Sequence, residues 1–198
     1  MTRINFHKDS VVERSLRRHF DDFYKGLKLD FRRNFDDETQ LLGVDGVIKS
    51  PDYDLVVDEK AATSYCNTRL MTLAFELSFI LNRGSEDKRM LGWFMDESKL
   101  TNLYCYMSNI KTDLGNLKLT TEDKVISYDI HLIDSSRLRK VFVSWLNGKN
   151  TDRDWYPEEN EARIHCSKNL QERPEVVIFK KSFLERLPEI CTKYSVTL

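Results

Sequence analysis

Three ionisable residues interrupt two apolar segments that a short turn separates. Asp45 lies in "LLGVDGVIK", and Asp58 and Lys60 lie in "LVVDEKAA". The intervening "KSPDYD" contains Ser-Pro-Asp, a strong turn signal, so the two segments are predicted to form a hairpin. Because alternate residues of a strand face opposite sides, Asp58 and Lys60 share one face. A turn centred on residues 51 and 52 would set Asp45 opposite Asp58.

This grouping predicts a site for a divalent cation. Two adjacent carboxylates repel each other unless a cation lies between them, and burying them unpaired is costly. Mg²⁺ typically binds one or two carboxylates and keeps water and phosphate as its other ligands. Lys60 could then orient or deprotonate a water molecule, or offset charge on a phosphate. The residue types therefore favour hydrolysis of a phosphodiester.

The alternative interpretation of the same residues is a solvent-exposed hairpin that carries an ordinary salt bridge. Exposed pairs of this kind are common and contribute little stability. The Val, Ile and Leu residues that flank the acids favour central, covered strands over that alternative.

The spacing D-x(12)-D-x-K within "GVDGVIKSPDYDLVVDEKAA" resembles that of the PD-(D/E)XK nuclease superfamily, which has the restriction-endonuclease-like fold. By this resemblance Asp45 is the first acid, Asp58 is the (D/E) residue and Lys60 is the lysine. Glu59 takes the variable position, and its main-chain carbonyl is implied to be a metal ligand. The clear resemblance spans residues 38 to 80.

Two features of the surrounding sequence bear on the resemblance. Gly43 and Val44 stand where the motif's name places a proline. Many members add an upstream acid, and we expect Glu38 to fill this role as a catalytic residue and metal ligand, with Glu13 as the second choice. For Glu38, the alternative is an ordinary carboxylate in a loop or at a helix start.

The resemblance implies a Mg²⁺-dependent endonuclease, a phosphodiester hydrolase for which Mn²⁺ is expected to substitute. DNA is the expected partner ahead of RNA, and we expect a homodimer. The expected fold is a single restriction-endonuclease-like α/β domain over residues 1–198, with a central mixed β-sheet flanked by helices. Two alternatives stay open: a non-catalytic nucleic-acid- or protein-binding module on the same fold, and an RNA-directed nuclease.

Apolar periodicity and turn signals predict the elements that must position these residues. A first amphipathic helix is expected to begin at Asp9 or Ser10, and a helix over 64–84 would carry Glu76. For Glu76 we favour a structural role, such as pairing with an arginine, over a contact with the metal site. A further helix over 135–148 is expected to be capped by Ser135 or Ser136. The remaining predicted elements are strands over 42–48, 55–61, 90–96, 101–110, 124–134, 162–168 and 174–181, with 90–96 paired to 101–110, and a short helix within 182–194.

Charge and composition limit the partners. The chain has 198 residues and a formal net charge of -1, from 31 basic and 32 acidic residues, so nucleic-acid binding would need local basic patches. Candidates are "RSLRRHF", "FRRNF", "SSRLRK" and "FKKSF". The four cysteines are far apart and predict reduced thiols. The longest apolar stretch, "LMTLAFELSFIL", contains Glu76 and is too short to span a bilayer, so we expect no membrane partner and a cytoplasmic location.

Overall fold

The computed structural model describes residues 3–83, 86–148, 157, 160–167 and 172–198, and these form four helices and ten strands in two sheets. One compact unit comprises Met1–Leu70, Leu103–Leu132 and Lys193–Leu198, and a second comprises Met71–Asn102 and Ile133–Thr192. We call them unit 1 and unit 2. The predicted class, a mixed α/β fold with a mixed sheet and flanking helices, is confirmed. The expectation of a single domain over residues 1–198 stays a prediction.

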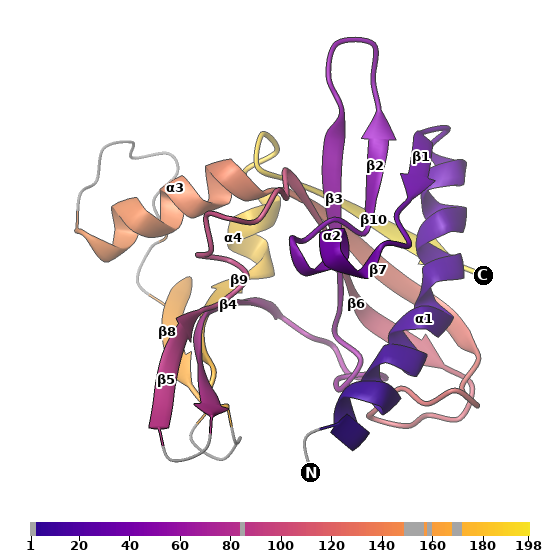
Figure 1. Ribbon diagram of the computed structural model, residues 1–198. Coiled ribbons are helices and arrows are strands. Elements are labelled where there is room, and N and C mark those ends of the chain that lie inside the picture. The colour runs from indigo at the N-terminus through magenta and orange to yellow at the C-terminus, as the bar shows by residue number, and fades with distance from the viewer. Residues whose placement is uncertain (1–2, 84–85, 149–156, 158–159, 168–171) are drawn as a thin grey trace. The chain divides into compact units, whose positions relative to one another are not determined.

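Unit 1 is built on a six-stranded sheet with the strand order β1-β2-β3-β6-β7-β10 (Figure 1). The β1–β2 and β2–β3 pairs are antiparallel, and β3 pairs with β6 in parallel, so the sheet is mixed. Its elements are α1 (Arg3–Gly26), β1 (Asp30–Arg33), α2 (Asp37–Leu41), β2 (Gly46–Lys49), β3 (Leu55–Ala61), β6 (Leu103–Thr112), β7 (Val125–Asp134) and β10 (Cys191–Thr197).

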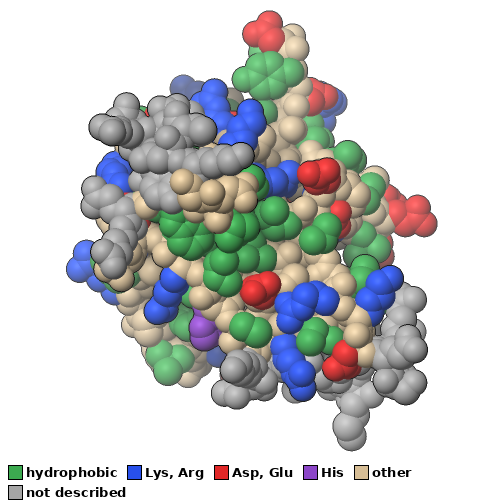
Figure 2. Space-filling model, turned by 90° about the vertical axis from the view of Figure 1, so that its left-hand side faces the viewer, with side chains coloured by type: hydrophobic (Ala, Val, Ile, Leu, Met, Phe, Trp, Pro, Cys, Tyr) green, Lys and Arg blue, Asp and Glu red, His purple; other side chains and the backbone are tan. Residues whose placement is uncertain are grey.

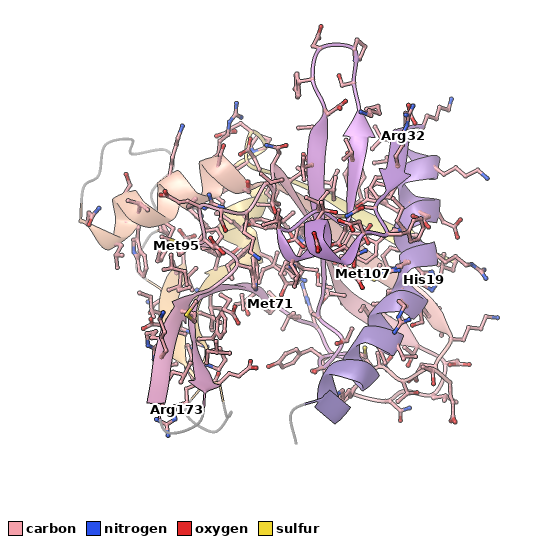
Figure 3. All side chains as sticks on the ribbon, viewed as in Figure 1. His19, Arg32, Met71, Met95, Met107 and Arg173 are labelled. Carbon is pink, nitrogen blue, oxygen red and sulfur yellow. The ribbon has the colours of Figure 1, made fainter. Side chains whose placement is uncertain are left out.

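The core of unit 1 lies between α1 and one face of this sheet. Leu16, Phe20 and Phe23 recur at helical spacing on α1 and are buried there. They belong to the same apolar cluster as Val57 of β3 and Met107 of β6. Figure 3 labels Met107 on β6 and His19 on α1, the two layers that meet in this core. Because side chains alternate along a strand, the residues between these core residues point to the opposite face of the sheet.

The hairpin has the register that the sequence predicts. Gly46 pairs with Val57 and Ile48 with Leu55, so the turn is centred on residues 51 and 52. Continued by one residue, this register sets Asp45 beside Asp58. The first strand is shorter than expected, because residues 42–45 precede β2 without joining the ladder.

Several predicted elements are wrong. The helix expected over 64–84 is replaced by strand β4 (Thr72–Arg83), whose buried residues Leu73, Phe75 and Leu77 alternate in the pattern of a strand. Glu76 therefore lies on a strand, and no helix directly follows the Asp58–Lys60 segment. A continuous apolar run fits a buried strand as well as a helix, which explains this error.

The remaining corrections concern helix ends and strand partners. Helix α1 begins at Arg3 rather than at Asp9 or Ser10. Helix α3 (Ser135–Leu146) is capped by Asp134, whose side chain accepts from the Arg137 N–H, and not by Ser135 or Ser136. The segments 90–96 and 101–110 do not pair, because β5 joins β4 while β6 joins β3. Residues 182–194 split between α4 (Lys181–Glu185) and β10.

Unit 2 contains a four-stranded sheet with the order β5-β4-β9-β8. Besides β4, its strands are β5 (Glu86–Leu91), β8 (Ala162–Cys166) and β9 (Glu175–Lys180). Its core is aromatic, with Phe75 and Phe94 in contact at a ring-centroid distance of 5.2 Å and Phe94 and Phe142 at 5.8 Å. The predicted helix and strands at 135–148, 162–168 and 174–181 are confirmed within about two residues.

The surface is mixed in charge. On the face that Figure 2 shows, basic, acidic and hydrophobic side chains are interspersed, in keeping with the balanced composition. In the part of the chain that the structure describes, no helix is long and apolar enough to cross a bilayer.

Gly46→Ala is predicted to destabilise the protein by about 1 to 3 kcal/mol or more, because a Cβ there would collide with the Phe31 ring and lie 2.9 Å from the Arg32 carbonyl oxygen. Urea unfolding followed by circular dichroism measures the change. Gly26→Ala is the matched control, since a Cβ at Gly26 meets nothing within 4 Å. Equal effects of the two substitutions would contradict the close approach of β1 to β2.

Candidate functional site

The structure brings Asp45 to the edge of β3, where the sequence predicts it. The Asp45 main-chain N–H donates to the Val57 carbonyl at 2.9 Å. Its carboxylate Oδ2 accepts from the Glu59 main-chain N–H at 2.7 Å. Two hydrogen bonds therefore fix Asp45 against β3, one through its backbone and one through its side chain.

Asp58 and Lys60 lie on the face of β3 that points away from α1. Val57, which alternates with them, is part of the core under α1. Lys60 Nζ lies 2.5 Å from Asp58 Oδ1, and Asp58 is only 3% exposed. The predicted shared face is confirmed, and the burial of Asp58 excludes the alternative of a fully solvated salt bridge.

The electrostatics of Asp45 show that the two carboxylates interact. Burial is the largest of the effects that raise the pKa of Asp45 to about 6, and the Asp58 carboxylate contributes to this rise through its negative charge and a side-chain hydrogen bond. The Glu59 N–H and the Lys60 ammonium act in the opposite direction. One ammonium therefore does not compensate two carboxylates, and the site favours additional positive charge or a proton.

Lys60 is held as an ammonium ion. Burial alone would lower its pKa, but the charges of Asp58 and Asp45 and the hydrogen bond to Asp58 outweigh burial and raise it. Of the roles expected for Lys60, orienting a water molecule and offsetting negative charge match this protonation state. Deprotonating a water molecule requires the neutral amine, which these two carboxylates disfavour.

The Glu59 side chain points to the opposite face and takes no part in the Asp45–Asp58 pair. Arg33 binds it through two hydrogen bonds of 2.9 and 3.0 Å, and both side chains are less than a tenth exposed. Burial raises the pKa of Glu59 to about 7 despite the Arg33 guanidinium. Arg33 also donates to Asp21 of α1 at 2.6 Å, which ties β3, β1 and α1 together.

The main-chain carbonyl of Glu59 is placed differently from its side chain. The N–H and C=O groups of one strand residue point to the same edge, and the Glu59 N–H points to Asp45. The carbonyl therefore faces the Asp45 side of β3, as the resemblance implies for a ligand. This carbonyl and the carboxylates of Asp45 and Asp58 are all oxygen donors, the ligand type that suits Mg²⁺ or Mn²⁺.

The structure gives no support for the upstream acid expected at Glu38. Glu38 lies in the first turn of α2 and is exposed. Among the described residues, no group of three or more His, Cys, Asp or Glu side chains is placed to hold a metal ion. Glu13 lies on α1, and its side chain is outside the described part of the structure. The geometry thus supports Asp45, Asp58 and Lys60, while the proposed role of Glu38 stays a prediction without support here.

Asn34 positions Asp45, and the sequence analysis missed it. Its main-chain N–H donates to the Asp45 carbonyl at 2.8 Å, and its side chain donates to the Val44 carbonyl at 2.7 Å and to Thr39 of α2 at 2.6 Å. Arg33 and Asn34 belong to "FRRNF", a segment that sequence alone marks only as a basic patch. An arginine next to an asparagine gives no signal of these roles, because no local sequence pattern identifies their partners.

Comparisons with known proteins give one similarity. No family model and no curated protein matches the sequence. A solved structure of the restriction endonuclease BglI, bound to its DNA recognition sequence, matches with a TM-score of 0.39 and 10% identity. The match covers 83% of this chain and 64% of that one. Similarity at this level does not establish what the chain does.

Asp45→Asn is predicted to stabilise the folded protein at pH 7.5 by about 1 to 3 kcal/mol. The raised pKa, about 6 against an ordinary 3.8, means that ionising Asp45 costs stability above pH 6, while below about pH 4 this cost is absent. Asparagine keeps an acceptor for the Glu59 N–H and removes the charge. The gain should therefore vanish at pH 4.

Urea unfolding at the two pH values measures this difference. Asp54→Asn is the control, since Asp54 is on the same hairpin but is exposed and pairs with Lys49. It should change stability by no more than about 0.5 kcal/mol. A loss of stability in Asp45→Asn at pH 7.5 would contradict repulsion between the two carboxylates.

Arg33→Ala is predicted to cost about 3 to 5 kcal/mol, because it leaves the buried Glu59 carboxylate without its partner. The double variant Arg33→Met/Glu59→Leu should recover most of that loss, since it removes both charges. Thermal and urea unfolding of the three proteins measure the effect. Arg32→Ala is the neighbouring control, because Arg32 is exposed and pairs with Asp30. A double variant as unstable as Arg33→Ala would overturn the assignment.

Proposed function

We propose that this chain is a Mg²⁺-dependent nuclease that hydrolyses phosphodiester bonds of DNA. The observation that carries the proposal is that Asp45, just before β2, and Asp58 of β3 interact beside the Lys60 ammonium. Burying two carboxylates side by side destabilises a folded protein. The same three residues are those through which the sequence resembles the PD-(D/E)XK nucleases.

The residues divide into ligands and charge-balancing groups. The carboxylates of Asp45 and Asp58 and the Glu59 carbonyl would hold the cation. A divalent cation bound there supplies positive charge that offsets the two carboxylates and polarises a phosphate oxygen. The chain itself provides the fixed placement of these oxygens, because the Glu59 N–H and the β2–β3 ladder hold Asp45 in position.

Lys60 contributes a fixed positive charge next to the proposed reaction centre. Its ammonium donates to Asp58, and its side chain is 29% exposed, so it can also reach a substrate or a water molecule. A positioned cation stabilises the negative charge that develops on a phosphate during hydrolysis. Lys60 thus has a role in orientation and electrostatic stabilisation.

The preference for DNA over other phosphodiesters rests on the sequence resemblance. The residues of the site are compatible with cleavage of either DNA or RNA, and with binding that does not lead to cleavage. A substrate panel of duplex DNA, single-stranded DNA and RNA separates these outcomes. Cleavage of RNA alone would keep the hydrolase assignment and overturn the preference for DNA.

The test is Mg²⁺-dependent cleavage by the purified chain and by Asp58→Ala and Lys60→Ala. Each substitution is predicted to reduce the cleavage rate by at least about 100-fold while circular dichroism shows an intact fold. EDTA should abolish cleavage by the wild-type protein, and Mn²⁺ should restore it.

Lys49→Ala and Asp54→Ala are matched controls, because these residues form an exposed lysine–aspartate pair on the same hairpin, outside the site. They should cleave at the wild-type rate. Wild-type rates in Asp58→Ala and Lys60→Ala, or cleavage that persists in EDTA, would refute the proposed function.

A further inference from the structure

A polar groove lies on unit 1, across β6, β7, β10 and the loop that follows β3. It encloses about 480 Å³, within the range of small-ligand sites. Most ligand pockets are lined by apolar and aromatic side chains. This groove is instead lined mainly by cationic, hydroxyl and amide side chains, among them Arg69, Lys111, Ser127, Ser195 and Thr197.

The groove is on the same face of the sheet as the proposed catalytic pair. Ile110, Tyr128 and Ile130 belong to the core under α1, so the residues that alternate with them face the other side. Lys111 and Ser127 are among these alternate residues. Asp58 alternates in the same way with Val57, and β6 pairs directly with β3. One sheet face therefore carries both features.

The two cations of the groove are available to a ligand. Arg69 and Lys111 are exposed, and neither side chain forms an ion pair or hydrogen bond with any residue that the structure describes. Three other exposed cations of unit 1 do have carboxylate partners: Arg18 with Asp22, Arg32 with Asp30 and Lys49 with Asp54.

The loop that carries Arg69 is fixed on both sides. Asn67 accepts from the Thr112 N–H at 3.0 Å, and Asn109 accepts from the Leu70 N–H at 2.8 Å. Both asparagines have a left-handed backbone, with φ of 57° and 53°. Such conformations persist only where surrounding contacts enforce them. Arg69 is thus held between two anchored residues, which lowers the entropic cost of binding through it.

The carboxylate in the groove is compensated internally. Asp129 accepts from Asn109 at 2.7 Å and from Ser195 at 2.6 Å, and it lies 3.6 Å from Lys193 Nζ. Its charge is therefore balanced by groups of the protein. The groove as a whole is left with the two uncompensated cations, Arg69 and Lys111.

We propose that this groove binds the phosphate backbone of the DNA substrate, at a distance from the bond that is cleaved. This inference rests on the proposed function. Arg and Lys, together with Ser, Thr and Asn side chains, are the groups that contact phosphate and sugar in protein–DNA complexes. Contacts of this type position the substrate without reading its sequence. The basic residues of α1 are on the opposite side of the sheet and do not contribute.

The test measures binding of a fluorescein-labelled 20-base-pair duplex by fluorescence anisotropy in EDTA, from 50 to 300 mM KCl. Each phosphate contact adds about 0.9 to the slope of log affinity against log salt. The double variant Arg69→Ala/Lys111→Ala is predicted to lower that slope by about 2 and the affinity by about tenfold at 100 mM KCl. Lys25→Ala/Lys28→Ala, which removes two exposed lysines that line a groove beside α1, should match the wild type.

In cleavage assays with Mg²⁺, the Arg69→Ala/Lys111→Ala variant should raise KM about tenfold and leave kcat within twofold. Wild-type binding, salt slope and KM in this variant would overturn the inference while the proposed function stands. A wild-type chain that neither binds nor cleaves DNA would overturn both. A fall in kcat at unchanged KM would also overturn it, because it would place these residues in the chemistry rather than in binding.

Discussion

The structure of the site depends on one unfavourable interaction, the repulsion between the carboxylates of Asp45 and Asp58 on adjacent β-segments. Burial and mutual charge raise the pKa of Asp45 to about 6, and a single ammonium, Lys60, balances the pair incompletely. Groups of this kind persist when the surrounding structure enforces them, and they cluster at functional sites. A divalent cation with oxygen ligands would remove this conflict, which is the physical basis of the proposed metal site.

The adjacent residues Arg33 and Asn34 hold the two acids in place through separate contacts. The Arg33 side chain anchors β3 through Glu59, and the Asn34 main chain anchors Asp45. Gly46 permits the close approach of β1 that both contacts need, because a side chain there would collide with Phe31 and the β1 backbone. The C-terminal end of β1 thus holds both β3, which carries Asp58, and the segment that carries Asp45.

The hairpin register and the shared face of Asp58 and Lys60 could be predicted from the sequence. The contacts that hold these residues in place could not. The turn at residues 51 and 52 fixed the hairpin register, and strand alternation placed Asp58 and Lys60 together. The pairing of Glu59 with Arg33 joins residues 26 positions apart, and Asn67 contacts Thr112 over 45 positions, so neither has a local signal. The helix predicted over 64–84 became β4 because a long apolar run does not distinguish the two states. For Glu38, the sequence left open whether it is a site acid or an ordinary carboxylate at a helix start, and the structure places it exposed in the first turn of α2.

The central claim is that Asp45 and Asp58 hold one divalent cation. Titration of the metal-free chain with Mn²⁺, followed by the loss of the free-ion electron paramagnetic resonance signal, tests it most directly. One bound ion is predicted per wild-type chain at pH 7.5, with binding lost in both Asp45→Asn and Asp58→Asn and retained in Asp54→Asn. No binding by the wild-type chain, or equal binding by the wild-type chain and the two site variants, would contradict the account.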